Sequence, residues 1–153
     1  MSASMLKEMM SMILISACLA GIPCKYSGGD NGNAEIIKMY EEGKCIAVCP
    51  EVLGGLATPR PCAEIQHGRV INTEGKDVSE EYRRGALLAL QKAEEAGCTE
   101  AILKAYSPSC GCREIYDGSF THTKIKGNGV FAQMCLEHGI QCISDEEYKE
   151  RER

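Results

Sequence analysis

The chain has 153 residues, enough for one domain, and 44% of them are hydrophobic and 25% charged. This composition excludes a disordered chain, and a domain of this length needs no disulfide bonds to fold. The formal net charge of −5 argues against a partner such as polymeric nucleic acid, whose binding proteins carry a basic excess. Ten cysteines are the unusual feature, and we expect some of them to take part in chemistry.

No apolar run reaches the roughly 20 residues that a transmembrane helix needs, so no membrane partner is expected. The segment Ile15–Cys18 resembles a lipobox, but the residues before it include Lys7 followed by Glu8 and lack a long apolar core. We therefore expect a cytoplasmic protein. Thiols stay reduced in that compartment, so many cysteines favour metal binding or catalysis over disulfide bonds.

The first half of the chain predicts two buried strands separated by a helix. Residues 1–11 form an N-terminal extension without a motif, and an Ile-rich strand begins at Met12. A helix capped by Asp30 or Asn31 follows and ends at about Gly43. Residues 45–49 form the second strand, which leads into a loop rich in Gly and Pro.

The second half continues this alternation. Residues 63–72 predict a short polar strand or hairpin, and the longest helix runs from Ser79 to about Ala96. We place four residues on the apolar face of that helix: Ala86, Leu87, Leu90 and Ala93. A third strand covers 100–105, a further helix 127–139 and a last short strand 140–144. The highly charged residues that follow are expected to fray.

Strands that alternate with helices at this spacing predict an α/β fold. We expect a single-domain, Rossmann-like three-layer sandwich with a mostly parallel sheet of about four or five strands. The domain is expected to span residues 12–146, with a charged tail at 147–153.

Three cysteines follow the three predicted core strands, namely Cys18, Cys49 and Cys110. In an open α/β sheet, ligands bind beyond the carboxyl ends of the strands, so these thiols should converge although they lie about thirty and sixty residues apart. Thiolates select zinc, Cu(I) or iron–sulfur clusters. No His lies in these loops and no paired Cys-x-x-Cys knuckles are present, so an iron–sulfur cluster with an open position fits better than zinc.

The other cysteines divide into two groups. Four fall within or at the ends of predicted elements and are expected to pack as small hydrophobes: Cys45, Cys98, Cys135 and Cys142. Three lie in loops near the predicted site and are candidates for an additional ligand or a sulfur relay: Cys24, Cys62 and Cys112.

Polar side chains in the same loops are candidates for the chemistry. Glu51 is a candidate general acid–base, or else a helix-cap or ion-pair carboxylate. Ser107 and Ser109 are candidates to donate hydrogen bonds to a cluster sulfur or a substrate, or else to cap backbone groups.

Basic residues and a glycine pair near these loops are candidates for binding substrate. Arg60 suits an anion or a carbonyl oxygen, while Lys25 and Lys104 are weaker candidates. Residues 127–129 (GNG) open the last predicted helix, whose N-terminus favours an anion.

Four motifs, taken together and in order, resemble the short single-domain thiouracil desulfurases. They are ILISACLAG (13–21), CPEVLGGL (49–56) with TPRP (58–61), LKAYSPSCG (103–111) and IYDGSF (115–120). The resemblance covers about residues 12–146. The chain departs from the family at 25–28, where KYSG replaces the common RYDG, and at Cys62, where Pro is usual. Both departures bear on substrate identity more than on the cofactor.

The resemblance implies a non-redox enzyme that depends on a [4Fe–4S] cluster held by Cys18, Cys49 and Cys110. Its fourth iron would take the sulfur of a thiolated pyrimidine such as 2-thiouracil. Glu51 and Ser107 match the family's catalytic residues. The partner implied is a small thiolated base or nucleotide, and we expect a monomer or a homodimer.

Two alternatives use the same cysteines. The chain would then be a non-enzymatic carrier of a cluster or of sulfur, or a structural zinc domain.

Overall fold

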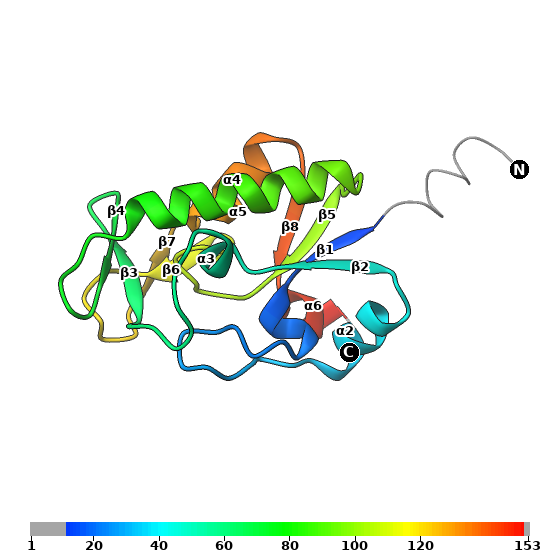
Figure 1. Cartoon of the computed structure of the whole chain (residues 1–153), viewed down its shortest axis with the longest axis horizontal. Coiled ribbons are helices and arrows are strands. Elements are labelled where there is room, and N and C mark those ends of the chain that lie inside the picture. The colour runs from blue at the N-terminus through cyan, green and yellow to red at the C-terminus, as the bar shows by residue number, and fades with distance from the viewer. Residues whose placement is uncertain (1–11, 152–153) are drawn as a thin grey trace, which may run out of the picture.

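The computed structural model describes residues 12–151, so the N-terminal extension 1–11 lies outside the described part. At its centre is a four-stranded sheet with the order β2-β1-β5-β8, in which every neighbouring pair is parallel (Figure 1). The strands are β1 (Ile13–Ser16), β2 (Cys45–Val48), β5 (Glu100–Leu103) and β8 (Gln141–Ser144). The predicted α/β class with a mostly parallel sheet is confirmed.

Helices cover both faces of this sheet (Figure 1). On one face lie α4 (Ser79–Glu95) and α5 (Val130–Glu137), and on the other lie η1 (Ala17–Ala20), α2 (Ala34–Glu41) and α6 (Asp145–Arg151). Each face has its own apolar cluster, one including Leu14 and Phe131 and the other including Ile15 and Ile36. Because both faces are covered, the strands are apolar along most of their length, as the sequence suggested.

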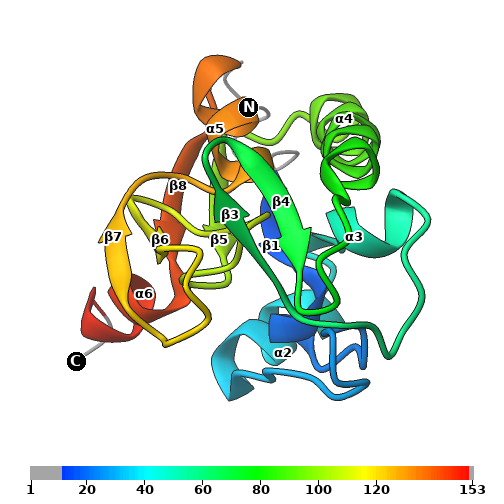
Figure 2. The same cartoon turned by 90° about the vertical axis from the view of Figure 1, so that its left-hand side faces the viewer.

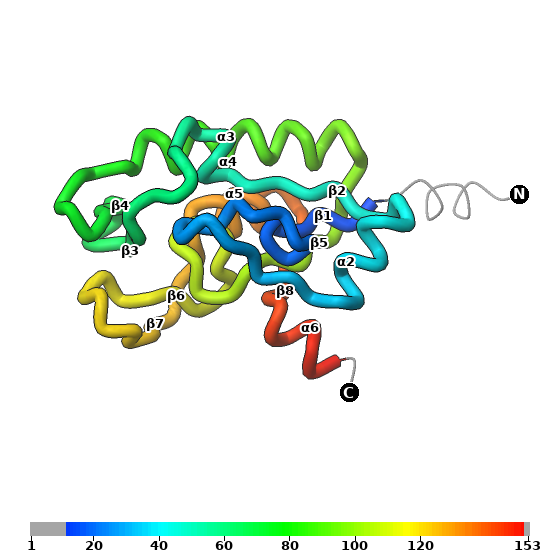
Figure 3. Tube along the Cα trace, turned by 60° about the horizontal axis from the view of Figure 1, so that its bottom comes forward, coloured from blue at the N-terminus to red at the C-terminus, as the bar shows by residue number. Residues whose placement is uncertain are grey.

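Two antiparallel hairpins extend the molecule beyond the carboxyl ends of the sheet strands (Figures 2 and 3). One pairs β3 (Ala63–Gln66) with β4 (Arg69–Asn72), and the other pairs β6 (Glu114–Tyr116) with β7 (Lys124–Lys126). A short helix, α3 (Pro50–Leu53), begins directly after β2 and packs against α4. Over the described residues, no helix has the length and apolar character needed to cross a membrane.

Some predicted details were wrong. The cap of α2 is Asn33 rather than Asp30 or Asn31, because its side-chain oxygen accepts from the amides of Glu35 and Ile36 at 3.0 and 3.1 Å. On α4, Leu87 is 43% exposed, because the buried face turns through Ala86, Ala89, Leu90 and Ala93 instead.

The charged tail does not fray at its start. Residues Asp145–Arg151 form α6, whereas 152–153 lie outside the described part. The helix is fixed because the buried carboxylate of Asp145 accepts from the Ala105 amide at 2.8 Å and Glu147 pairs with Arg113. The high charge of residues 145–151 therefore belongs to a helix with an exposed face and does not indicate a frayed terminus.

Candidate functional site

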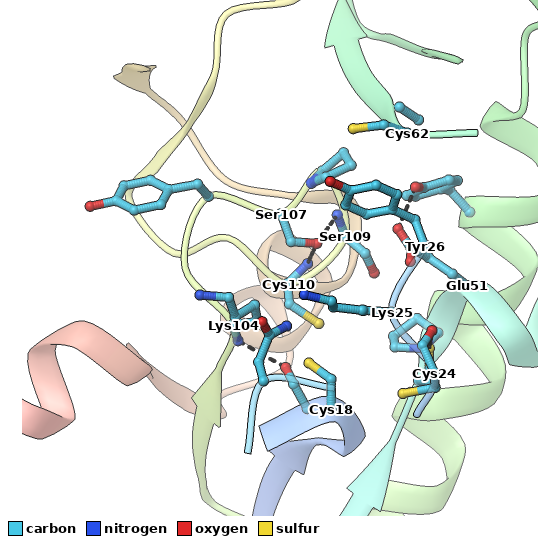
Figure 4. A pocket seen from close by; sticks show the side chains of 18 of the residues that line it. Cys18, Cys24, Lys25, Tyr26, Glu51, Cys62, Lys104, Ser107, Ser109 and Cys110 are labelled. Atoms are coloured by element: carbon cyan, nitrogen blue, oxygen red, sulfur yellow. Dashed lines mark hydrogen bonds between the residues drawn. The ribbon is translucent and has the colours of Figure 1, made fainter. Parts of the chain in front are cut away.

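A cavity of about 310 Å³ lies at the carboxyl ends of β1, β2 and β5. Cys18, Cys49 and Cys110 all line it, as the strand-end argument predicted. Cys24 and Cys62 line it as well, and Figure 4 shows the Cys18 and Cys110 side chains on the same side of the cavity. Five of the ten cysteines therefore surround one space.

The three cysteines occupy different positions relative to the ends of their strands. Cys18 lies in η1, which follows β1 without a break, and Cys49 follows β2 directly as the residue before α3. Cys110 lies farther along, in the loop after β5. Its position depends on how that loop is held rather than on the strand alone.

The loop at 107–110 is fixed from inside and from outside. Inside it, the Ser107 hydroxyl oxygen accepts from the amides of Ser109 and Cys110, both at 3.0 Å (Figure 4). Outside it, the first amides of α5 donate to loop carbonyls: Val130 to Pro108 at 2.8 Å and Phe131 to Ser109 at 2.9 Å. The helix terminus that the GNG sequence suggested for an anion thus binds the backbone of the cysteine loop.

Gly129 makes that docking feasible. A side-chain carbon at this position would lie 2.4 Å from the Ser109 carbonyl oxygen and 2.8 Å from that of Ser107. Any other residue would push α5 away from the loop that carries Cys110.

The charge environment of the thiols differs between them. Burial raises the pKa of Cys18 and raises that of Cys110 well above the ordinary thiol value. Hydrogen bonding with Cys24 lowers the pKa of Cys49 to about 7. Negative charge on Cys18 or Cys49 raises the pKa of Cys110 further, so the three thiolates would repel one another across the cavity unless a cationic centre lay between them.

The buried hydroxyl of Ser109 indicates that a hydrogen-bonding ligand binds in this cavity. Ser109 is 1% exposed and lines the cavity, yet its hydroxyl has no hydrogen-bond partner among the described residues. A buried polar group without a partner costs about 1–3 kcal/mol. Three thiols around one space, with an unsatisfied hydroxyl beside Cys110, fit an iron–sulfur cluster and a ligand next to it.

Within residues 12–151, no three His, Cys, Asp or Glu side chains gather closely enough to mark a single-ion site. The cysteines of a cluster bind different iron atoms and stand farther apart than the ligands of one ion.

The Glu51 carboxylate at the cavity wall is held from two sides. The Tyr82 hydroxyl donates to Oε1, and the Arg60 guanidinium pairs with Oε2. The two side chains that hold it are almost fully buried, at 3% exposed for Tyr82 and 5% for the Arg60 side chain. Glu51 is thus an ion-pair carboxylate, one of the two interpretations of its sequence position, and it also lines the cavity.

The two lysines occupy different positions. Figure 4 shows the Lys25 side chain reaching into the cavity. Lys104 lines the same cavity, and its ammonium lies 3.4 Å from the Asp145 carboxylate. Lys104 is therefore partly neutralised by α6.

The remaining cysteines separate as their sequence positions suggested, with one exception. Cys45, Cys98, Cys135 and Cys142 are buried in the apolar clusters. Cys112, predicted to lie near the site, also packs in the core between sheet and helices and contacts Cys142. It does not line the cavity, because its thiol lies against Cys142 of β8 and donates to the Cys110 carbonyl at 3.6 Å.

Tyr82 was missed by sequence reasoning. It stands in the first turn of the longest helix, where a single aromatic side chain is ordinary. Nothing in the local pattern indicates a carboxylate partner thirty-one positions earlier in the chain.

Comparisons with known proteins agree with this geometry. A sequence profile of the 2-thiouracil desulfurase family matches residues 13–147. The chain is 41% identical over 146 residues to the protein YbbK of Bacillus subtilis (strain 168), covering 89% of this chain and 97% of that one. The solved structure of the [4Fe–4S]-dependent thiouracil desulfidase TudS superposes with a TM-score of 0.85 at 42% identity, covering 92% of this chain and 94% of the other.

Proposed function

The chain belongs to the 2-thiouracil desulfurase family, and we propose that it is a [4Fe–4S]-dependent enzyme that replaces the sulfur of a thiolated pyrimidine with oxygen from water. The observation that carries this proposal is one cavity lined by the three strand-end thiols among its five cysteines, an unsatisfied hydroxyl and a fixed carboxylate. Its volume of about 310 Å³ is at the lower end of the range for small-molecule sites.

Cys18, Cys49 and Cys110 would hold the cluster. When bound, the iron atom that no cysteine occupies supplies a Lewis acid for the thiocarbonyl sulfur, which makes the adjacent carbon more electrophilic. Three cysteine ligands suit this chemistry because a fourth would close the reactive position.

Glu51 is the group that would move the proton of the attacking water. Each of its oxygens already accepts one hydrogen bond, but a carboxylate has about four lone-pair sites, so acceptor capacity remains toward the cavity. The products are the oxo-pyrimidine and sulfide, so no net electron transfer is needed.

The two serines of the cysteine loop would act differently. Within residues 12–151 the Ser107 hydroxyl acts only as an acceptor, so its proton is available to orient water or substrate while its oxygen shapes the loop. The buried hydroxyl of Ser109 is the stronger donor candidate for a sulfur atom in the cavity because it has no other partner among the described residues. Lys25 would contact the substrate, whereas Arg60, which also lines the cavity, would act mainly by holding Glu51.

The test is anaerobic purification followed by iron and acid-labile sulfide analysis and by turnover of 2-thiouracil, 2-thiouridine and its 5′-phosphate. We expect about four irons per chain and release of uracil or its derivative with sulfide. Joint replacement of Cys18, Cys49 and Cys110 by Ala should abolish cluster binding, whereas Cys98→Ala, in the buried core, should retain it.

Glu51→Gln should keep the iron content and lower turnover by about 10²–10⁴-fold, the usual contribution of general acid–base catalysis. A colourless preparation that cannot be reconstituted would refute the cluster. A cluster-loaded protein inactive on all three substrates would refute the reaction, and full activity in Glu51→Gln would remove that residue from its role.

A further inference from the structure

We propose that Tyr82 and Arg60 are positioning residues that fix the Glu51 carboxylate for catalysis, a proposal that rests on the function assigned above to Glu51. Their contacts, their burial and the close backbone packing of α3 against α4 support this role.

Tyr82 contributes the first contact. Its ring is packed with the apolar residues around Val70 and Val78, and its hydroxyl donates to Glu51 Oε1. A buried Tyr hydroxyl needs a hydrogen-bond partner, and here that partner is the carboxylate at the cavity wall. The ring thus anchors the hydroxyl, and the hydroxyl fixes one oxygen of Glu51.

Arg60 contributes the second contact and joins three segments. Besides Glu51, its guanidinium donates to the Cys24 carbonyl at 2.8 Å, the Thr58 hydroxyl at 2.9 Å and the Ala57 carbonyl at 3.2 Å. Its backbone amide also donates to the Tyr26 carbonyl at 2.7 Å. Four hydrogen bonds from the Arg60 guanidinium go to protein groups, so Arg60, although it lines the cavity, is well placed to hold Glu51.

The two helices that carry this arrangement touch through their backbones. A side-chain carbon on Gly85 of α4 would lie 1.7 Å from the Pro50 carbonyl oxygen, and one on Gly54 would lie 1.9 Å from that of Glu81. Glycine in the middle of a helix is unfavourable by about 1 kcal/mol relative to Ala, so Gly85 needs a reason, and the close approach of α3 supplies it. This packing holds Tyr82 and Glu51 at a fixed separation.

The chemical consequence is orientation. A displacement of about 1 Å in a catalytic group can lower a rate by about 100-fold, while binding of the substrate depends on other contacts. Loss of either partner should therefore lower kcat and leave KM nearly unchanged.

The first experiment compares cluster-loaded, anaerobic wild type with Tyr82→Phe, Arg60→Gln and Arg60→Lys. We expect unchanged iron content and visible spectrum, a kcat at least about 10-fold lower in Tyr82→Phe and Arg60→Gln, and a KM within about threefold. Arg60→Lys should recover part of the loss because it keeps the charge. Tyr40→Phe on α2 and Arg69→Gln, which pairs with Asp77 in solvent, are matched controls and should behave as wild type.

The second experiment needs no turnover. The thermal midpoint of the loaded protein is measured for Tyr82→Phe, Glu51→Ala and the double variant. If the hydroxyl holds the carboxylate, the shift caused by Tyr82→Phe should fall to less than half in the Glu51→Ala background, because partners in contact are not additive.

These outcomes separate the two proposals. Equal midpoint shifts in both backgrounds, an unchanged kcat, or a raised KM at constant kcat would overturn the positioning role. A wild type that is loaded but inactive would refute the proposed function, while the midpoint experiment would still decide whether Tyr82 fixes Glu51.

Discussion

At the scale of single residues, two serines in one loop have opposite hydrogen-bond situations. The Ser107 oxygen accepts two backbone amides, so it shapes the turn that presents Cys110. Ser109, two positions later, is buried with no partner for its hydroxyl among the described residues. Ser107 therefore stabilises the loop, whereas the Ser109 hydroxyl remains available to form a hydrogen bond in the cavity.

This contrast predicts opposite effects of the same substitution. Ser107→Ala should destabilise the cluster-free chain by about 1 kcal/mol, as loss of a capping oxygen does. Ser109→Ala should leave its stability unchanged or raise it, because removing a buried group without a partner removes its desolvation penalty. In the loaded enzyme Ser109→Ala should nevertheless lower turnover. Urea unfolding and steady-state assays measure the two effects, and a Ser109→Ala chain less stable than Ser107→Ala would contradict the assignment.

Sequence reasoning was informative for residues whose role follows from their place on a strand. Cys18 and Cys49 could be assigned to one edge of the sheet because each follows a buried strand within two residues. Tyr82 and Arg60 could not be connected to Glu51, since their contacts depend on how α4 and the Gly- and Pro-rich loop pack in three dimensions. Arg60 was expected to bind an anion or a carbonyl oxygen of a ligand. It lines the cavity and also pairs with Glu51, a contact that its place in the sequence did not indicate.

At the scale of elements, α5 acts as a support for the cysteine loop. Its N-terminal amides satisfy loop carbonyls, and its close approach depends on Gly129. The N-terminus of a helix usually leaves several amides without intrahelical acceptors. In α5, carbonyl groups of the cysteine loop act as those acceptors.

Gly129→Ala should therefore displace the loop at 107–110 and weaken cluster retention. Overpacking of this kind destabilises by about 1–3 kcal/mol. We expect a lower unfolding midpoint and faster loss of iron to a chelator under anaerobic conditions. Glu137→Ala on the exposed side of the same helix is the control and should match wild type. Wild-type iron retention in Gly129→Ala would show that α5 does not hold the site.

The hairpin of β6 and β7 and the helix α6 were not predicted, and both have a physical explanation. The two strands are three residues each and include exposed charged residues such as Glu114 and Lys124, so no alternation is long enough to detect. The sequence of α6, DEEYKER, is so charged that it resembles a free terminus, although tertiary contacts of Asp145 and Glu147 fix it.

At the scale of the whole molecule, the alternation of strands and helices was sufficient to predict the parallel sheet. It also predicted that a cavity would lie at the carboxyl ends of the strands. The order β2-β1-β5-β8 depends on long-range pairing, which no local pattern contains. The described core lies on both faces of this sheet, and the site lies where three of its strands end.

The packing of α6 against the rest of the domain, through the Glu147–Arg113 ion pair, should depend on pH. Burial opposes the charge of Glu147, but hydrogen bonds from Arg113 and Ser144 outweigh it, so its pKa is lowered from the ordinary value of 4.5. A carboxyl with a depressed pKa stabilises the fold above its unfolded pKa and loses that contribution as pH falls through the folded value.

Glu147→Gln should thus lower the thermal midpoint at pH 7 by an amount corresponding to no more than about 1 kcal/mol, since the pair is partly exposed. The difference from wild type should shrink as the pH falls below about 4.5 and disappear once the pH has passed below the lowered pKa of the folded state. Glu150→Gln in the same helix should show little effect at either pH. A difference that is constant with pH would mean that the charge of Glu147 does not fasten α6.

The three thiols proposed to hold the cluster each follow a different strand, and this has a consequence for biosynthesis. As the chain leaves the ribosome, Cys18 and Cys49 emerge early, whereas Cys110 and the α5 residues that seat its loop emerge among the last third of the sequence. β5, which leads into that loop, pairs with β1, the first strand of the described chain. A nascent fragment that ends before β5 carries only two of the three proposed cluster thiols, so insertion of the cluster should await the completed chain.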